Sequence, residues 1–115
     1  VDDGYENRLL VRTVLQHAGY SVFEASDAQE ALNNLREHSP DLCLVDLSLP
    51  GTSGAELIRT VRAEAAFGKL PIALYTATEI NAAMRDFLNL YAIEHVIPKP
   101  CEPTLLLETV AAAFA

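Results

Sequence analysis

Five polar side chains of this 115-residue chain follow short apolar runs, at the points where buried strands are expected to end. They are Asp2 and Asp3 after Val1, Asp46 after residues 42–45, Thr76 after residues 70–75, and Lys99 shortly after residues 95–97. The carboxyl ends of parallel strands lie at one edge of a sheet, where ligands bind in open α/β folds. The spacing therefore predicts that carboxylates, a hydroxyl and an ammonium meet at one edge.

These groups together suit one kind of chemistry. Carboxylates that lie close together repel one another unless a cation neutralises them. Their oxygens are hard ligands, and Mg²⁺ prefers a few of them together with water and a phosphate. Lys99 adds a mobile positive charge, and Thr76 adds a hydroxyl donor. An acid nucleophile with such neighbours has the parts needed for phosphoryl transfer to a carboxylate.

Each residue also has an ordinary structural interpretation when it is taken alone. Asp46 can be a turn former before the Leu-Pro-Gly sequence that follows it, and Asp2-Asp3 can cap a helix. Thr76 can be a strand-end hydroxyl, and Lys99 an exposed turn residue. Because all of them fall at successive strand ends, the sequence favours a shared site over separate structural roles.

The elements that must position these side chains alternate regularly along the chain. Strands are expected at residues 1–3, 21–25, 42–45, 70–75 and 95–97, and helices at residues 6–18, 27–39, 53–63, 78–91 and 103–113. Residues 1–3 read as the end of a strand whose beginning is absent from the sequence. The alternation predicts a single α/β domain over residues 1–115, with a parallel sheet, helices on both faces and right-handed crossovers.

Local signals mark the ends of the expected helices. A glycine should end the first helix, two capping boxes should begin the second and third, a threonine should cap the fourth, and a proline suits the first turn of the last. These residues are Gly19, Asp27 with Glu30, Ser53 with Glu56, Thr78 and Pro103.

The composition of the chain argues against several classes of function. A formal net charge of −8 and a pI near 4.7 argue against direct binding to nucleic acid, which depends on Lys and Arg at the phosphates. No apolar run approaches the roughly 20 residues that span a bilayer, and no secretory signal is visible, so we expect no membrane contact and a cytoplasmic location. Cys43 and Cys101 lack metal-ligand spacing and fit a reducing compartment.

Four segments, in order, make the chain resemble the receiver domain of response regulators in two-component signalling. They are Val1-Asp2-Asp3, residues 45–54 around Asp46, Thr76-Ala77 and Lys99-Pro100. The resemblance covers nearly the whole chain. It implies the flavodoxin-like fold of CheY, a three-layer sandwich with a five-stranded parallel sheet of order 2-1-3-4-5 and five helices.

The resemblance also implies roles for the site residues. Asp46 would be the phosphoacceptor, and Asp3 and Asp46 would bind Mg²⁺ directly. Asp2 would help through water, and the backbone carbonyl of Ser48 would complete the protein ligands. Thr76 and Lys99 would contact the phosphoryl oxygens, as in the family. Ser48 and Thr78 occupy positions that influence how long the phosphoryl group survives in the family.

The implied partner is a sensor histidine kinase or a histidine phosphotransfer protein. In this interpretation the chain is not an enzyme acting on other molecules, although it assists its own phosphorylation and dephosphorylation. It could be a single-domain regulator, a receiver joined to an effector domain in a longer chain, or part of a hybrid histidine kinase.

The chain departs from the family pattern on the last expected strand. Receivers commonly carry Tyr or Phe three residues before the lysine, and its rotation accompanies movement of the threonine on strand four. Here that position is Val96. We therefore expect phosphorylation to shift residues 76–78 and the helix at residues 80–90 without an aromatic flip on the last strand.

Three other functions compete with this interpretation. A phosphatase of the haloacid dehalogenase type needs a second acid two residues after the nucleophile, where this chain has Ser48. A flavin or nucleotide binder needs a phosphate-cradling loop after the first strand, where Asp2 and Asp3 would repel the phosphate. A receiver-like structural module that is not phosphorylated is compatible with Val96 but leaves the acids, Thr76 and Lys99 unexplained.

Overall fold

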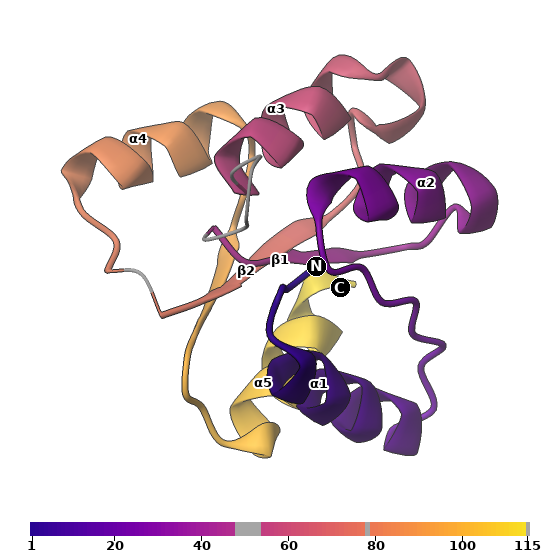
Figure 1. The fold of residues 1–115 in the computed structure, drawn as a ribbon. Helices are drawn as coiled ribbons and strands as arrows, with labels where there is room; N and C mark the ends of the chain where they lie inside the picture. The colour runs from indigo at the N-terminus through magenta and orange to yellow at the C-terminus, as the bar shows by residue number, and fades with distance from the viewer. Residues whose placement is uncertain (48–53, 78, 115) are drawn as a thin grey trace.

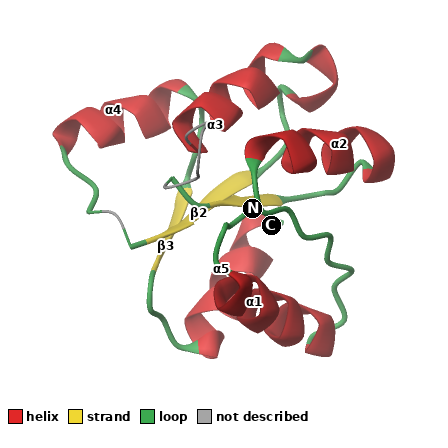
Figure 2. Cartoon of the chain, viewed as in Figure 1, coloured by secondary structure: helices red, strands yellow, loops and turns green. Residues whose placement is uncertain are grey.

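A parallel sheet runs through the middle of the molecule, and helices cover both of its faces (Figures 1 and 2). The computed structural model describes residues 1–47, 54–77 and 79–114. Its elements are α1 (Tyr5–His17), α2 (Ala28–His38), β1 (Cys43–Val45), α3 (Gly54–Ala63), the 3₁₀ helix η1 (Ala65–Phe67), β2 (Ile72–Thr76), α4 (Ala82–Leu90), β3 (His95–Pro98) and α5 (Pro103–Ala113). The five α-helices and the parallel sheet confirm the predicted α/β architecture.

The three strands lie side by side in the order in which they occur along the chain. Cys43 of β1 is opposite Ile72 of β2, and Ala73 of β2 is opposite His95 of β3. Every residue of β2 is buried, as expected for a central strand with helices on both faces. Because the strands are parallel, Val45, Thr76 and Pro98 bring the chain out of the sheet at the same edge.

The core has two parts, one on each face of the sheet. Helices α2, α3 and α4 pack over one face, where Leu57 and Ile58 contact strand residues such as Leu74. Helices α1 and α5 pack over the other face, where Leu106 meets Ile97. This division fits the period-two alternation of side chains along a strand, which sends neighbouring residues to opposite faces.

Several predicted helix ends are confirmed. Helix α1 ends at His17, and Gly19 has φ +98°, a conformation that favours glycine. The Asp27 side chain accepts a hydrogen bond from the Glu30 N–H at the start of α2, and Pro103 stands in the first turn of α5. The predicted cap of the fourth helix is wrong: Asn81 caps α4 by accepting from the Met84 N–H. Ser53 and Thr78 lie outside the described residues.

The first two expected strands, at residues 1–3 and 21–25, are not strands in the described part of the chain. Backbone hydrogen bonds nevertheless place Val1 and Asp2 between the segment at 21–25 and β1. They run from the Val1 nitrogen to the Leu44 carbonyl (2.6 Å), from the Asp46 N–H to the Val1 carbonyl (3.0 Å) and from the Asp2 N–H to the Ala25 carbonyl (3.0 Å).

These contacts are too few to make a ladder. Strand assignment requires repeated pairing. Here Val1 alone bonds to the backbone of Leu44 and Asp46, and Asp2 alone bonds to Ala25. The predicted count of five strands and their full order therefore stay predictions.

Arg62 joins two connections of the chain, the one between α3 and β2 and the one between α4 and β3. Its guanidinium donates to the carbonyl oxygens of Tyr91 (2.9 Å), Phe67 (3.2 Å) and Leu70 (2.6 Å). Tyr91 follows α4, Phe67 ends η1 and Leu70 precedes β2. A single side chain on α3 thus links the connection that precedes β2 to the connection that precedes β3.

We expect Arg62→Met to lower the free energy of unfolding by about 2–3 kcal/mol, because charge-assisted hydrogen bonds to several carbonyl oxygens are lost at once. Urea denaturation measures this change. The matched control is Arg36→Met, which removes an arginine whose ion pair with Glu64 (2.6 Å) is largely exposed and should cost about 0–1 kcal/mol. Equal effects of the two substitutions would contradict this role for Arg62.

Candidate functional site

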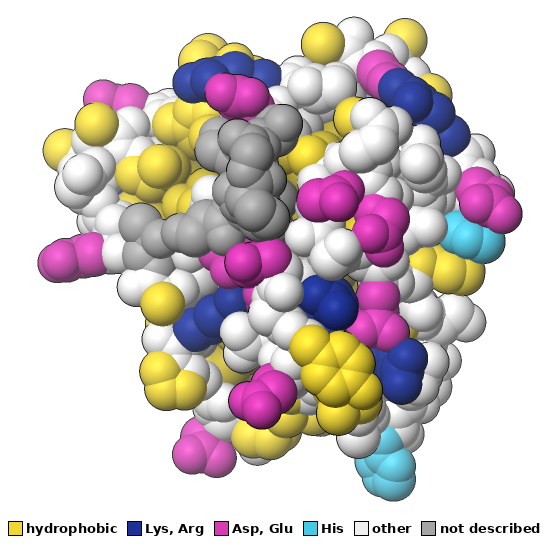
Figure 3. All heavy atoms as spheres, in the orientation of Figure 1, with side chains coloured by type: hydrophobic (Ala, Val, Ile, Leu, Met, Phe, Trp, Pro, Cys, Tyr) yellow, Lys and Arg dark blue, Asp and Glu magenta, His cyan; other side chains and the backbone are white. Residues whose placement is uncertain are grey.

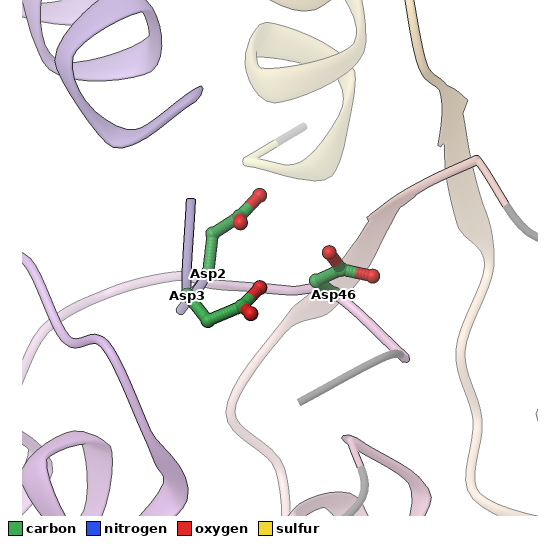
Figure 4. Close-up of side chains that lie close together, drawn as sticks. All are labelled: Asp2, Asp3 and Asp46. Carbon is green, nitrogen blue, oxygen red and sulfur yellow. The ribbon is translucent and has the colours of Figure 1, made fainter. Parts of the chain in front are cut away.

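The polar residues predicted to converge do meet at the carboxyl edge of the sheet. Asp2 precedes α1, Asp46 follows β1, Thr76 ends β2 and Lys99 follows β3. One oxygen from each of Asp2, Asp3 and Asp46 lies within 4.8 Å of the others. In Figure 4 the three acids extend from two separate segments into the same region. Ser48, the other expected ligand, lies outside the described residues.

The three carboxylates differ in their exposure. Asp2 and Asp46 are each only 7% exposed, whereas Asp3 is exposed to solvent. Taking a carboxylate out of water is costly unless it is paired or hydrogen-bonded. Asp2 and Asp46 therefore need a positive partner within the protein, and Asp3 does not.

Lys99 provides that partner for both buried acids. Its ammonium donates to Oδ2 of Asp46 at 2.9 Å and also to Oδ2 of Asp2. Burial acts to lower the pKa of Lys99, but the hydrogen bonds and negative charges of Asp2 and Asp46 outweigh it and raise that pKa above its ordinary value. The lysine is consequently charged at neutral pH, and it bridges two acids that would otherwise repel each other.

Thr76 holds the other oxygen of Asp46. Its hydroxyl, which is 2% exposed, donates to Oδ1 of Asp46 at 3.1 Å. A hydroxyl and an ammonium therefore each contact one carboxylate oxygen of Asp46. These are the two kinds of donor that stabilise negative oxygens during group transfer.

Asp2 is fixed in place by the turn that leads into α1. Its Oδ1 accepts from the Gly4 N–H at 2.8 Å, and its backbone carbonyl accepts from Arg8 at 2.8 Å. Gly4 is itself the N-cap residue of α1, and no side-chain hydrogen bond caps this helix. The interpretation of Asp2 as a simple helix cap is therefore not supported, and its Oδ2 accepts from Lys99.

The arrangement could hold a metal ion. The grouped ligands are carboxylate oxygens, which suit hard cations such as Mg²⁺ and Ca²⁺. The chain carries a formal net charge of −8, and acidic side chains are numerous on the face shown in Figure 3, with basic ones among them. Such a field favours the approach of a cation to the acidic cluster.

Two residues near the site were missed by the sequence reasoning. The ring of Tyr75, directly before Thr76, lies beneath Lys99, whose Nζ is 5.1 Å from the ring centroid. Gly54, which begins α3, approaches the backbone that carries Asp46. An aromatic residue beside Thr76 and a glycine at a helix start were visible signals, but neither indicates a contact until the strands and helices are packed.

Val96, at the position where receivers commonly carry an aromatic residue, is 36% exposed on β3. It lies opposite Leu74 of β2.

Within the described residues no membrane-spanning helix is found, because none combines sufficient length with sufficient apolar character.

Comparison with known proteins identifies relatives over almost the whole chain. Residues 1–111 match the family model described as response regulator receiver domain. The chain is 34% identical over 114 residues to the phosphate regulon transcriptional regulatory protein PhoB of Pseudomonas aeruginosa, covering 99% of this chain and 49% of PhoB. It is 30% identical over 113 residues to the CAI-1 autoinducer sensor kinase/phosphatase CqsS of Vibrio cholerae, covering 97% of this chain and 16% of CqsS.

The fold has a close counterpart among solved structures. The chemotaxis protein CheY4 of Vibrio cholerae superposes with a TM-score of 0.91 at 28% identity, covering 97% of this chain and 92% of CheY4. The chain thus spans nearly the whole of CheY4 but only about half of PhoB and a much smaller part of CqsS.

Gly54 allows α3 to start against the phosphoacceptor candidate. A Cβ atom at this position would lie 2.2 Å from the Asp46 carbonyl oxygen and 2.7 Å from the Leu47 Cα. The Gly54 N–H also donates to the Leu47 carbonyl at 3.1 Å. Both neighbours are backbone atoms, so a side chain here forces β1 and α3 apart.

We expect Gly54→Ala to lower the free energy of unfolding by about 1–3 kcal/mol, as overpacking against backbone does. It should also shift the NMR resonances of Asp46 and Thr76. Gly68→Ala is the matched control, because its Cβ would meet no atom closer than 3.8 Å and should change stability by less than about 1 kcal/mol. Thermal denaturation of both variants measures these changes. If Gly54→Ala were as stable as the wild type, the close approach of Gly54 to the Asp46 backbone would be absent in solution.

Proposed function

Because the chain belongs to the response regulator receiver domain family, we propose that it accepts a phosphoryl group onto Asp46 from a phosphohistidine. One observation carries this proposal: a buried carboxylate has its two oxygens contacted by a hydroxyl and an ammonium, with two further carboxylates beside it. The donor would be a sensor histidine kinase or a histidine phosphotransfer protein, and the reaction would take place in the cytoplasm.

In the proposed reaction, a carboxylate oxygen of Asp46 forms a bond to phosphorus as the phosphorus–nitrogen bond of the phosphohistidine breaks. The electron pair of that bond stays with the imidazole nitrogen, and an acyl phosphate remains on Asp46. Lys99 and Thr76 already contact Asp46, so a small movement would let both donate to the phosphoryl oxygens. Their role is to stabilise negative charge that increases at those oxygens.

We propose that Asp2, Asp3 and Asp46 hold Mg²⁺, together with the backbone carbonyl of Ser48. The carboxylate oxygens within 4.8 Å of one another support this ligand set, as does its preference for hard cations. When bound, the ion supplies positive charge that neutralises the acids and the incoming phosphoryl group. Asp46 would share its carboxylate between the ion and the phosphoryl group, while Asp3, being exposed, leaves room for water ligands.

We propose that the chain is a phosphoacceptor and not an enzyme acting on other substrates. It would assist only the gain and loss of its own phosphoryl group. The relatives that contain a similar segment are different kinds of protein: PhoB is named a transcriptional regulatory protein, and CqsS a sensor kinase/phosphatase. An effector or kinase domain in a longer chain is therefore part of this proposal.

We also propose the strand order 2-1-3-4-5 for the sheet beneath the site, which the backbone bonds of Val1 and Asp2 support.

Incubation with acetyl phosphate and Mg²⁺ should add one phosphoryl group, detected by intact-mass spectrometry. Asp46→Asn should abolish the product, because an amide oxygen is a far weaker nucleophile than a carboxylate, and removal of Mg²⁺ with EDTA should slow labelling at least about tenfold. Asp41→Asn is the matched control, since Asp41 is exposed before β1 and should label normally.

The same experiment separates the competing functions. Labelling that persists in Asp46→Asn would reject Asp46 as the acceptor. No labelling of the wild-type chain would favour a structural module, and turnover of phosphate monoesters would favour a phosphatase of the haloacid dehalogenase type.

The proposed output is a movement of residues 76–78 and α4 without an aromatic flip on β3. Thr76 would turn from Asp46 toward the phosphoryl group, and the chain from Thr76 leads directly to α4. Val96 has no ring that could rotate into the space Thr76 leaves.

Addition of beryllofluoride with Mg²⁺, which mimics the phosphoryl group, should therefore shift the NMR resonances of residues 76–77 and 82–90 and leave the Val96 rotamer unchanged. Asp46→Asn with the same additions serves as the control and should show no shifts. An α4 whose resonances do not respond in the wild type would contradict the proposed output.

A further inference from the structure

Tyr75 is a buried tyrosine of the central strand. It is 5% exposed, next to last in the central strand β2 and directly before Thr76. Its neighbours in the core are apolar residues of α1 and α5, among them Leu15, Leu106 and Val110. The proposed phosphoryl transfer assigns no role to this buried phenol, although it lies beside one of the groups that the transfer needs.

The contact that matters is with Lys99. Tyr75 is opposite Ile97 of β3, two residues before Lys99, so the ring lies under the chain as it leaves the sheet. The Lys99 ammonium lies over the ring, 5.1 Å from its centroid. A cation over the face of an aromatic ring is attracted by the ring's quadrupole, and more strongly where water is excluded. The Lys99 side chain is only 12% exposed, so this condition is met.

The phenol itself stays neutral. Burial raises the pKa of Tyr75, and the neighbouring Cys101 side chain and Asp2 raise it further, while Lys99 acts in the opposite direction. The attraction between Tyr75 and Lys99 is consequently that of an ammonium and a neutral ring, not an ion pair with a phenolate. The ring face, and not the hydroxyl, is the part of the side chain that should be needed.

The ring also restricts where Lys99 can go. A lysine is a flexible side chain that loses rotamer entropy when it is fixed in one place. Here the ammonium lies over the ring and also donates to Oδ2 of Asp46 and Oδ2 of Asp2. Tyr75 shares a buried cluster with Leu106 and Val110 of α5 and Leu15 of α1, so its own position is set by well-packed helices.

We propose that Tyr75 is a positioning residue for phosphoryl transfer, whose ring holds the Lys99 ammonium beside Asp46. The proposal rests on the function inferred above, because it concerns the rate at which Asp46 accepts a phosphoryl group. Tyr75 itself does not touch the reacting atoms. It acts through Lys99, and it makes the position of Lys99 depend on the packing of the α1 and α5 layer.

The test compares Tyr75→Phe and Tyr75→Leu in labelling by acetyl phosphate with Mg²⁺. Tyr75→Phe keeps the ring and should label within about twofold of the wild type. Tyr75→Leu removes the ring face and should lower the saturating rate constant by about three- to tenfold, the range of a partly desolvated cation–π contact. The half-saturating acetyl phosphate concentration should change by less than about twofold, because the ring does not contact the phosphodonor.

Two controls separate positioning from packing. Tyr20→Leu removes another tyrosine of the same core cluster, which stacks on Phe114 and not under Lys99, and should leave the rate constant unchanged. In a Lys99→Met background, Tyr75→Leu should have no additional effect, since the ring acts only through the lysine. If Tyr75→Leu does not fold, Tyr75→Met fills the same space without a ring and takes its place.

A spectroscopic measurement gives a readout that does not depend on labelling. The ε-methylene protons of Lys99 should be shifted upfield by the ring in the wild type and in Tyr75→Phe, and should lose this shift in Tyr75→Leu. Equal rate constants for wild type and Tyr75→Leu would overturn the positioning role while leaving the phosphoacceptor function in place. A wild-type chain that takes no label would overturn both, even if the ring shift of Lys99 were seen.

Discussion

The carboxyl edge of the sheet depends on one ammonium placed between two buried carboxylates. Asp2 and Asp46 are almost fully removed from water, and Lys99 contacts both. Without that cation the two acids would repel each other in an environment that screens poorly. The ion triad therefore holds the Asp46 carboxylate in place. A charged, fixed carboxylate is also what a nucleophile toward phosphorus must be.

The triad is assembled from segments far apart in the chain, so its geometry is a property of the sheet. Val45, Thr76 and Pro98 leave parallel strands at one edge, which brings Asp46, Thr76 and Lys99 together. Gly54 lets α3 approach the backbone of Asp46, and Arg62 links the connections that precede β2 and β3. The residues that would perform the proposed chemistry are few, but their distances are set by packing elsewhere.

The sequence predicted those parts of the fold that depend on local patterns. Apolar runs located β1, β2 and β3, and the convergence of Asp2, Asp46, Thr76 and Lys99 followed from the geometry of parallel strands. Other features depend on contacts between distant segments. Asn81 and not Thr78 caps α4, and the approaches of Gly54 to Asp46 and of Tyr75 to Lys99 exist only once the layers pack. A pattern within ten residues carries no information about such contacts.

The two donors on Asp46 connect the site to different layers of the molecule. Thr76 ends β2, and the chain from it leads to α4 on one face of the sheet; Lys99 rests on Tyr75, which is packed between α1 and α5 on the other face. In the proposed reaction a phosphoryl group on Asp46 would replace the carboxylate oxygens as the partner of both donors, so both would have to move or re-orient together. Because the ring lies under Lys99 and limits its travel, we expect the larger displacement to follow the threonine toward α4. Val96 supplies no aromatic ring that could turn with the threonine.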